Sequence, residues 1–373
     1  MEIYGTLGIV GGGQLAVMTA EAARRLGVRS TALAASTEDP IHRVVGSSIV
    51  GDARDPRDLR RLAEQCEVVT FDHELVDPAV LAMLEDEGIV LRPGATAMAI
   101  AIDKHRQLRL FRSLGLAVPD TVVVHDVDAA IAAATDFGDA VLKSATGGYD
   151  GRGVLLDGRP DAIRAWFPER EATVLVQPRI HIDDEIAVQV VRAVDGSMVV
   201  YPVVRTVQED GMCAVVQVPS GLAPDVELDA QRQAEMIAEE IGVVGVLAVE
   251  FFEIDGAVVL NEIAARPHNS GHVTLESSRT SQFENHVRAV VGQPLGSTEL
   301  VVPAAAMANV VGVDGMDGRF GRLPTDVAVH LYGKEPRPGR KLGHVTSTAS
   351  STEVAVERAV QAARQLEGGV LAS

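Results

Sequence analysis

The sequence has 373 residues, of which 47% are hydrophobic and only 3% aromatic, and its formal net charge is −19. This length predicts two or three subdomains with aliphatic cores, and the acidic charge without a basic patch argues against a nucleic-acid partner. No apolar stretch approaches the ~20 residues of a membrane span and the start lacks a basic region, so we expect neither membrane insertion nor export. Cys66 and Cys213 are too isolated for a disulfide framework or a metal cluster, which favours a reducing cytoplasm.

The first predicted elements are a strand and a helix joined by a glycine turn. Residues 6–10 (TLGIV) predict a short buried strand, and residues 11–16 (GGGQLA) match the dinucleotide fingerprint G-x-G-x-x-A at the start of a helix. A second strand over 29–35 ends near Glu38 and Asp39, roughly where a ribose-binding acid would lie. This stretch alone indicates either a nicotinamide-binding fold or merely a tight strand-to-helix turn.

The next predicted elements are a strand over 67–72 and one helix over 97–115. Lys104 lies early in this helix, and Gly115 is its predicted C-cap. Most helical lysines are solvated, so the pattern by itself gives Lys104 no role.

A glycine-rich loop follows within residues 120–190, which predict the order β-α-β-β-α-β. The strand over 139–145 carries Lys143 and leads into residues 146–154 (TGGYDGRGV), whose glycine amides can surround an anion. A lysine just before such a loop supplies a point charge for a phosphate. The alternative is a plain glycine-rich hairpin tip.

Two buried carboxylates distinguish the hairpin predicted over 247–252 (LAVEFF) and 257–264 (AVVLNEIA), because each strand carries one of them, Glu250 or Glu262. A buried carboxylate without a partner is costly, and two of them on neighbouring strands indicate a hard cation such as Mg²⁺. A two-residue turn would place them on opposite faces. We therefore predict a three-residue loop over 254–256 with its glycine left-handed, which would put them diagonally adjacent on one face. The alternative is an edge hairpin with solvated glutamates.

Two further stretches concentrate polar side chains. Residues 266–272 (RPHNSGH) follow the hairpin at a strand end, where α/β proteins bind ligands. Residues 334–344 (KEPRPGRKLGH) hold four Lys and Arg residues in an acidic chain, which predicts an anion site. A solvated charged turn is the alternative there.

The NEIA strand, the RPHNSGH loop and residues 280–284 (TSQFE) together resemble the 5-(carboxyamino)imidazole ribonucleotide synthase family, over nearly the whole chain. The resemblance implies an α/β ATP-grasp fold with a Rossmann-like domain over 1–100, an ATP-grasp domain over 101–298 with a lid at about 120–185, and a small α+β domain over 299–373. It implies a cytoplasmic enzyme, usually a homodimer, that uses ATP, bicarbonate and Mg²⁺ to carboxylate aminoimidazole ribonucleotide through carboxyphosphate in de novo purine synthesis.

The resemblance also implies roles for individual residues. Mg²⁺ would be held by Glu250 and Glu262. The residues implied to contact ATP are Lys104, Lys143, Gly148, Tyr149, Asp150, Gly151, Arg152, Gly153, Val154, Gln177, Pro178, Arg179, Ile180, Glu185, Gln208, Asn261 and Glu262. The residues implied to contact the ribonucleotide are Gln14, Leu15, Glu74, Lys334, Arg340 and Lys341. The residues implied to act in catalysis are Arg266, His268, Asn269, Tyr149, Asp150 and Arg152.

Several positions depart from the family pattern. Leu75 stands where Asn is common, Thr146 where Arg is frequent, Gln177-Pro178 where two acids are common, and Gln208 where many members carry His. Because proline lacks an N–H, we expect a neighbour such as Ile180 to contact adenine. Two alternatives stay open: a nicotinamide-dependent oxidoreductase, and a non-catalytic ATP-grasp relative that only binds nucleotide.

Overall fold

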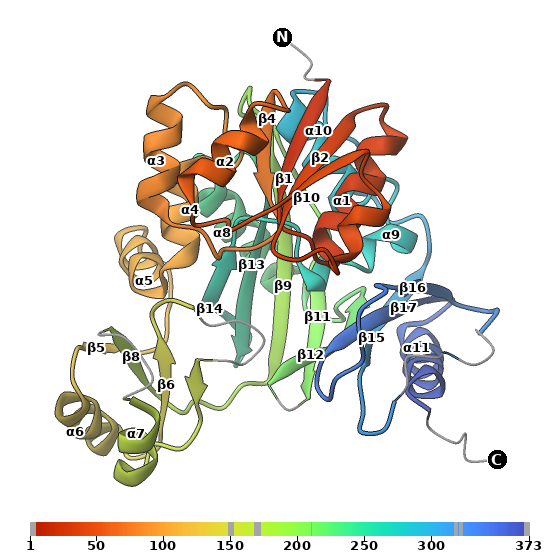
Figure 1. The fold of residues 1–373 in the computed structure, drawn as a ribbon. Helices are drawn as coiled ribbons and strands as arrows, with labels where there is room; N and C mark the ends of the chain where they lie inside the picture. Colours follow the sequence, from red (N-terminus) through yellow and green to blue (C-terminus); the bar gives the residue numbers. More distant parts are fainter. Residues whose placement is uncertain are drawn as a thin grey trace.

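The computed structural model has an α/β architecture with three sheets (Figure 1). No helix in the described part of the chain is long and apolar enough to cross a membrane. The residues that the structure describes are 5–147, 153–167, 173–209, 211–316, 320 and 324–368.

The N-terminal sheet has four parallel strands in the order β3-β2-β1-β4. Parallel pairing brings the carboxyl ends of neighbouring strands to one edge, so the glycine turn after β1 and the polar residues after β4 lie together. The strands predicted over 6–10, 29–35 and 67–72 are confirmed as β1, β2 and β4. The elements of this region are β1 (Thr6–Val10), α1 (Gln14–Arg25), β2 (Arg29–Ala34), η1 (Pro40–Arg43), β3 (Ser47–Val50), α2 (Pro56–Ala63), β4 (Val68–Phe71) and α3 (Pro78–Asp86).

The predicted single helix over 97–115 is wrong, because the structure has two helices, α4 (Ala95–Ile102) and α5 (Lys104–Ser113). Asp103 separates them in an extended conformation and caps α5, since its side chain accepts hydrogen bonds from the backbone N–H groups of His105 (2.8 Å) and Arg106 (3.3 Å). An aspartate side chain that bonds nearby amides favours a cap over a helix interior. Lys104 is therefore the first residue of a helix.

A second, antiparallel sheet has the strand order β5-β8-β6-β7 and confirms the predicted sequence of elements. Helices α6 and α7 accompany it at the lower left of Figure 1. The elements are β5 (Val122–Val124), α6 (Val127–Phe137), β6 (Ala140–Ser144), β7 (Val154–Leu155), α7 (Pro160–Trp166) and β8 (Val174–Pro178).

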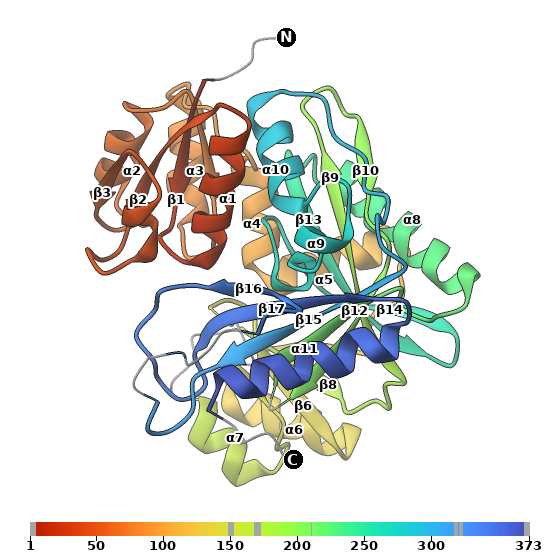
Figure 2. The ribbon, with the colours of Figure 1, turned by 90° about the vertical axis from the view of Figure 1, so that its right-hand side faces the viewer.

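The central sheet has nine strands, in the order β14-β13-β9-β11-β12-β15-β17-β16 with β10 beside β9. It continues across residue 299 without a break, because β12 pairs with β15. Helix α11 lies along the β15–β17 end (Figure 2). The elements are β9 (Asp184–Arg192), β10 (Met198–Val200), β11 (Val204–Glu209), β12 (Met212–Val218), α8 (Pro224–Glu240), β13 (Gly245–Ile254), β14 (Ala257–Ala264), η3 (Asn269–Gly271), α9 (Thr274–Ser277), α10 (Gln282–Val291), β15 (Ala304–Val311), β16 (Ala328–Leu331), β17 (Lys341–Ala349) and α11 (Thr352–Leu366).

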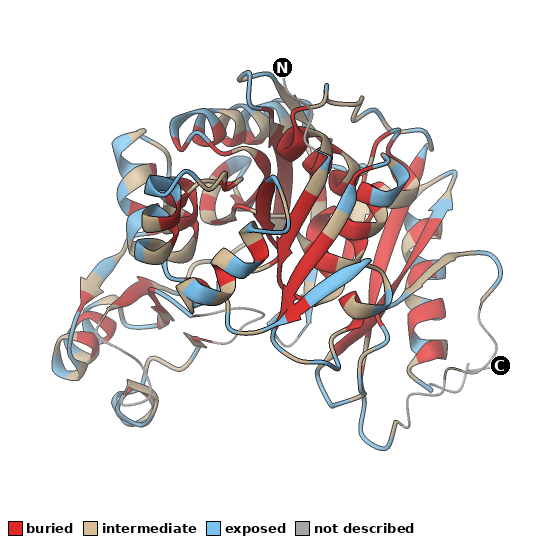
Figure 3. Cartoon of the chain, turned by 45° about the horizontal axis from the view of Figure 1, so that its top comes forward, coloured by how far each residue is buried: buried red, intermediate tan, exposed pale blue. Residues whose placement is uncertain are grey.

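One hydrophobic core joins the N-terminal sheet to the central sheet. Val10 and Phe71 of the former belong to the same cluster of buried side chains as Val249 and Ile263 of the latter. Figure 3 shows that much of the length of the central strands is buried. The ends of β1, β4 and β14 are thereby fixed relative to one another, and Gln14, Glu74 and Arg266 follow these ends.

The hairpin between β13 and β14 differs in detail from its prediction. Ile254 pairs with Ala257, so the turn has two residues, Asp255 and Gly256, both with positive φ (51° and 79°). The predicted three-residue loop is wrong. A bulge between Glu250 and Phe251 instead shifts the register so that Glu250 faces Glu262 directly. One extra residue in β14 restores the face that the short turn would have reversed, and the prediction that both carboxylates share a face is confirmed.

Candidate active site

Two carboxylates and several cations converge on the hairpin. Glu250 and Glu262 are opposite one another, with 24% and 36% of their side chains exposed. The Lys104 ammonium contacts Glu262 Oε2 from the start of α5. Burial raises the pKa of Glu250, while the charges of Lys104 and Lys341 oppose this shift. The site thus contains two neighbouring carboxylates and several positive charges. The carboxylates favour a bound cation, and the positive charges favour an anionic ligand.

Lys143 reaches the same hairpin from β6. Its Nζ donates to Asn261 Oδ1 (2.8 Å) and lies 5.7 Å from the centre of the Phe252 ring. Asn261 is the extra residue of the bulge. Burial lowers the pKa of Lys143 to about 8, and the nearby charge of Lys104 contributes. Two lysines from separate elements thus face one carboxylate pair.

Glu185 borders this group from β9, where it lies opposite Phe252 of β13 and Thr206 of β11. Burial and the charge of Glu250 raise its pKa, while a hydrogen bond from Gln208 opposes the shift. Gln208 also donates to Thr206 Oγ1 (3.4 Å). Glu185 and Gln208 therefore lie together.

The end of β8 supplies the other predicted nucleotide contacts. Gln177 is buried and donates to Thr121 Oγ1 (3.0 Å), and Pro178 ends the strand. The Arg179 amide donates to Asp139 O (2.8 Å), so it is used within the sheet. Ile180 follows, half-buried.

Most of the glycine-rich loop lies outside the residues that the structure describes. Val154 pairs with Lys143 across β6 and β7, and the Ser144 amide donates to Gly153 O (2.8 Å). The two ends of the loop are therefore next to Lys143. The predicted residues that lie outside the described residues are Gly148, Tyr149, Asp150, Gly151 and Arg152.

Arg266 and His268, which follow the hairpin, face two different acids. Arg266 Nε donates to Glu74 Oε2 (2.7 Å), which links the end of β14 to the segment after β4. His268 Nε2 lies 3.7 Å from Glu250 Oε1, and its Nδ1 is 2.8 Å from Ser270 Oγ. These contacts place the guanidinium and the imidazole between the carboxylate pair and the N-terminal turn.

Asn269 behaves differently from its two neighbours. It is buried, its Nδ2 donates to Asn309 Oδ1 (3.1 Å), and its Oδ1 accepts from Asn309 Nδ2 (2.9 Å). Gln282 fixes the preceding residue, since it accepts from His268 N (3.0 Å) and donates to His268 O (2.7 Å). The loop is therefore held by the side-chain amides of Asn309 and Gln282, to which the prediction gave no role. The only sequence signal for them was the presence of Asn and Gln residues in otherwise apolar segments.

The N-terminal glycine turn already holds a carboxylate of the protein. Asp72 Oδ2 accepts hydrogen bonds from the backbone N–H groups of Gly13 (3.1 Å) and Ala16 (3.3 Å). Gly11 has φ 127°, and a Cβ there would overlap the Asp72 side chain. In a dinucleotide site such amides bind the pyrophosphate. Asp72 was missed by the sequence reasoning, although an acid at the end of a parallel strand beside a glycine turn was the available signal.

The C-terminal cations divide into two groups. Lys334 reaches the first residue of α1, because its Nζ contacts Gln14 Oε1, and Leu15 beside it is buried. Lys341 is buried at the start of β17, and its charge acts on Glu250. Arg340 instead donates to Glu335 O (3.1 Å) within its own loop. The structure brings Lys334 and Lys341 toward the predicted site, whereas Arg340 is bonded within its own loop.

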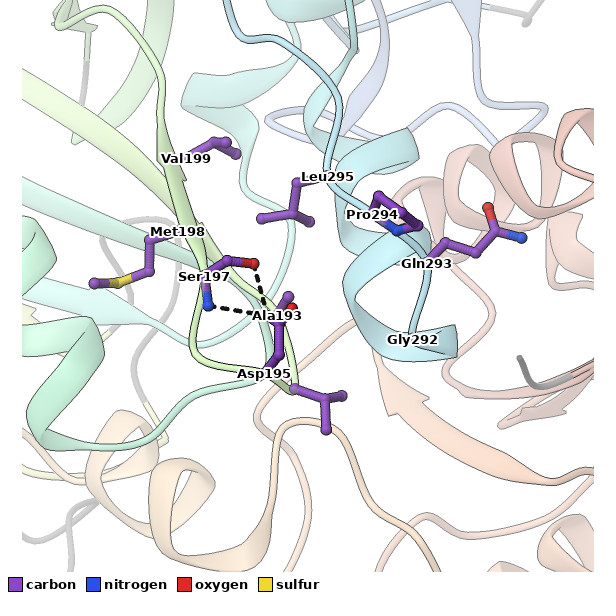
Figure 4. Close-up of a pocket in the computed structure, with 10 residues that line it drawn as sticks. Ala193, Asp195, Ser197, Met198, Val199, Gly292, Gln293, Pro294 and Leu295 are labelled. Atoms are coloured by element: carbon purple, nitrogen blue, oxygen red, sulfur yellow. Dashed lines mark hydrogen bonds between the residues drawn. The ribbon is translucent and has the colours of Figure 1, made fainter. Parts of the chain in front are cut away.

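A separate cavity of about 260 Å³ lies between the β9–β10 connection and the segment after α10 (Figure 4). Its one ionisable lining residue, Asp195, accepts from the N–H (3.0 Å) and hydroxyl (2.7 Å) of Ser197. None of the predicted site residues lines this cavity.

Among the described residues, no group of three His, Cys, Asp or Glu side chains could hold a metal ion. The carboxylates of Glu250 and Glu262 nevertheless fit a hard cation that takes its other ligands from phosphate oxygens and water, as Mg²⁺ does.

Comparison with known families covers the chain in three segments. Residues 4–102 match the ribonucleotide synthetase preATP-grasp domain, 109–283 the ATP-grasp domain, and 305–358 the phosphoribosylaminoimidazole carboxylase C-terminal domain. The architecture is therefore an ATP-grasp fold.

Named relatives cover nearly the whole chain. It is 43% identical to an N5-carboxyaminoimidazole ribonucleotide synthase of Mycobacterium tuberculosis, over 97% of this chain and 87% of the relative. It is 35% identical to that of Synechococcus elongatus, over 93% and 91%. The N5-carboxyaminoimidazole synthase structure of Aspergillus clavatus, in complex with ADP and 5-aminoimidazole ribonucleotide, superposes with a TM-score of 0.87 at 28% identity, over 98% of this chain and 100% of that one.

Proposed function

Because this chain belongs to the N5-carboxyaminoimidazole ribonucleotide synthase family of ATP-grasp enzymes, we propose that it carboxylates the exocyclic amine of 5-aminoimidazole ribonucleotide, with bicarbonate and ATP as co-substrates. The observation that carries the proposal is the opposed pair Glu250 and Glu262, with Lys104 in contact with Glu262 and Lys143 bonded to the adjacent Asn261. ADP and phosphate are the other products, and the reaction belongs to de novo purine synthesis.

In the first step, a bicarbonate oxygen attacks the γ-phosphorus of ATP, and the bond to the bridging oxygen of ADP breaks. Lys104 and Lys143 supply fixed positive charge for the phosphates. Glu250 and Glu262 would hold Mg²⁺, which neutralises charge on the transferred phosphoryl group when it is bound. The product of this step is carboxyphosphate.

In the second step, the exocyclic amine attacks the carboxyl carbon of carboxyphosphate, inorganic phosphate leaves, and the nitrogen loses a proton. Arg266 and His268 lie between the two substrate regions and are suited to orient bicarbonate or the amine. Asn269 has both polar side-chain atoms bonded to Asn309, which supports a role in holding the loop. Water must be kept out, since it would hydrolyse carboxyphosphate. The sheet of β5–β8 with its glycine-rich loop is the proposed lid.

The remaining contacts are proposed from the resemblance and from the positions of the residues. For ATP, the Ile180 amide would bind adenine, because the Arg179 amide already donates to Asp139 O within the sheet. Glu185 would accept hydrogen bonds from the ribose hydroxyls. For the ribonucleotide, Gln14, Glu74 and Lys334 would form the site. Lys341 and Arg340 would add charge for its phosphate.

We also propose that each chain has three domains, over 1–100, 101–298 and 299–373. We propose further that the protein is a homodimer and is cytoplasmic. The three matched family segments support these boundaries. Cys66 and Cys213 are not joined by a disulfide, which supports a reducing compartment.

ADP release is the test of the proposed function. We expect release in bicarbonate buffer with Mg²⁺ and ATP to rise strongly when 5-aminoimidazole ribonucleotide is added. ATP binding without any ribonucleotide-dependent release would instead identify a non-catalytic ATP-grasp relative.

A further inference from the structure

A polar residue interrupts an otherwise apolar strand in the C-terminal part of the chain. Strand β15 reads AAAMANVV, and Asn309 is its one residue that is not Ala, Val or Met. Asn309 is only 5% exposed. Asn is unfavourable in strands, and burial of its amide costs free energy unless hydrogen bonds replace those made to water. A buried amide at this position therefore indicates specific partners.

The partners of Asn309 are the loop of residues 266–272 and strand β12. Its Oδ1 accepts from Asn269 Nδ2 (3.1 Å), and its Nδ2 donates both to Asn269 Oδ1 (2.9 Å) and to Cys213 O (2.7 Å). The two asparagine amides thus form a reciprocal pair of hydrogen bonds. Such a pair fixes orientation as well as distance, because rotation of either amide breaks both bonds.

Packing alone does not call for an amide here. The preceding residue, Ala308, belongs to the same buried cluster as Ala355 of α11. Successive side chains point to opposite faces of a strand, so Asn309 lies on the face away from this helix. Met307 shares that face and clusters with Val273, directly after the loop. An apolar side chain would continue this packing, so the amide at 309 serves the loop itself.

Amide side chains from three elements hold three consecutive residues of this loop. The pairs are Gln282 of α10 with His268, Asn309 of β15 with Asn269, and Gln189 of β9 with Ser270. Of the three amides, Asn309 alone belongs to the segment over 305–358, which matches the C-terminal domain family. It is therefore the amide that connects the loop to the C-terminal part of the sheet.

The neighbouring strand β17 brings a cation of the predicted site. Val311, two residues beyond Asn309, lies opposite Lys341 in the pairing of β15 with β17. The charges of Lys341 and of Arg266, which is on the loop, both act on Glu250. The amide pair thus connects the two segments that bring these cations to one carboxylate.

We propose that Asn309 is a positioning residue for the carboxylation, which keeps the loop that carries Arg266 and His268 in register with Lys341 of β17. The proposal rests on the proposed function, because bicarbonate and the amine are the groups that this loop would orient. A misplacement of about 1 Å can cost about 10²-fold in rate. When the amine is misaligned, water attacks carboxyphosphate in its place and returns bicarbonate and phosphate. ADP is then released without carboxylated product.

The substitution Asn309→Leu removes these hydrogen bonds, keeps the branching at Cγ and adds no charge. One reaction with ¹⁴C-bicarbonate, ATP and 5-aminoimidazole ribonucleotide gives both the label on the ribonucleotide and the ADP released. We expect carboxylation to fall about tenfold or more and the product formed per ADP to fall at least about twofold, with KM for ATP within about twofold of wild type. Asn309→Ser, whose smaller side chain is easier to accommodate, carries the same expectation if the leucine variant does not fold.

Asn285→Leu is the matched control, because Asn285 is also buried and its amide bonds the Tyr201 hydroxyl (2.9 Å), Gly296 O (3.1 Å) and Gly296 N (2.7 Å), none of them in a predicted site residue. It should lower stability while the product formed per ADP stays at the wild-type value.

A wild-type ratio of product to ADP in the Asn309 variants, even at a lower overall rate, would show a merely structural role and overturn the proposal. A fall of this ratio in Asn285→Leu as well would also overturn it, since any loosening of the fold would then have the same effect. A wild-type protein whose ADP release does not respond to the ribonucleotide would instead contradict the proposed function.

Discussion

The glycine turn before α1 and the glutamate hairpin of β13 and β14 both resemble binding sites in the sequence, but the protein satisfies them differently. The amides of the turn bond to the protein's own Asp72, so its anion position is filled. At the hairpin, Glu250 and Glu262 face lysines from other elements. A sequence motif such as the glycine turn therefore predicts local backbone geometry. Whether the motif binds a ligand depends on the charged side chains that surround it in the fold.

The comparison also argues against a nicotinamide-dependent oxidoreductase. Such an enzyme would bind a pyrophosphate at the turn, where Asp72 would repel it. The rival also leaves the carboxylate pair and the loop over 266–272 without a role.

The largest expected effect is at the hairpin. Glu262→Gln keeps the shape and removes one of two carboxylates, so we expect turnover to fall by roughly 10²-fold or more, about 3 kcal/mol of transition-state stabilisation, while the protein stays folded. Steady-state ADP release at saturating Mg²⁺ measures it. Glu253→Gln is the control on the same strand, because the Glu253 side chain accepts a hydrogen bond from Gly256 N (2.6 Å) in the turn. Near wild-type turnover of Glu262→Gln would contradict the metal assignment.

The cationic C-terminal loop tests whether the N-terminal turn belongs to the ribonucleotide site. Lys334→Ala should raise KM for the ribonucleotide by about 10- to 150-fold, or ~1.5–3 kcal/mol, with KM for ATP little changed. Arg340→Ala should act in the same direction but less, because Arg340 bonds to its own loop. An equal rise in both KM values would mean that the loop acts on closure.

Gln14 distinguishes the two interpretations of the turn. Gln14→Ala should weaken ribonucleotide binding by about 1–3 kcal/mol, because it leaves polar partners unsatisfied, and ATP binding should not change. Calorimetric titration of each ligand measures this. Unchanged ribonucleotide affinity, together with NADH binding that Gly13→Val abolishes, would show that the turn is a dinucleotide site.

The last prediction concerns stability and not activity, at the joint between the two regions. His286 accepts from the Val246 amide of β13 (3.1 Å) and lies 2.8 Å from Thr70 Oγ1 of β4. Burial lowers its pKa from 6.5 to about 3. Below about pH 6.5 the unfolded chain binds a proton that the folded chain does not, so this group should reduce the free energy of unfolding by about 1.4 kcal/mol per pH unit. Denaturant unfolding of wild type and His286→Gln across pH 7 to 4 should show the steeper loss in wild type, and parallel curves would refute the neutral assignment.

Much of the fold was predictable because hydrophobic periodicity and turn residues determine it locally. The strands over 6–10 and 257–264 and the order of elements in the small sheet follow such patterns. The break at Asp103 was not predicted, because the apolar periodicity continues through it and only the side-chain cap interrupts the helix.

The site was predictable in its residue types and less so in its geometry. Glu250 and Glu262 share a face as expected, but the cause is the extra residue Asn261, whose bulge leaves no mark in the alternation of side chains. Asp72 and Gln282 depend on contacts between segments far apart in the sequence. The resemblance supplied the substrate roles, which no local pattern contains.

Incorporation of labelled bicarbonate tests the central claim most directly. The protein is incubated with ¹⁴C-bicarbonate, Mg²⁺, ATP and 5-aminoimidazole ribonucleotide, and the label on the ribonucleotide is measured before the product decarboxylates. We predict incorporation that matches ADP release one for one and is lost when ATP or the ribonucleotide is omitted, or in Glu262→Gln. ADP release without label on the ribonucleotide, or labelling without ATP, would contradict the account.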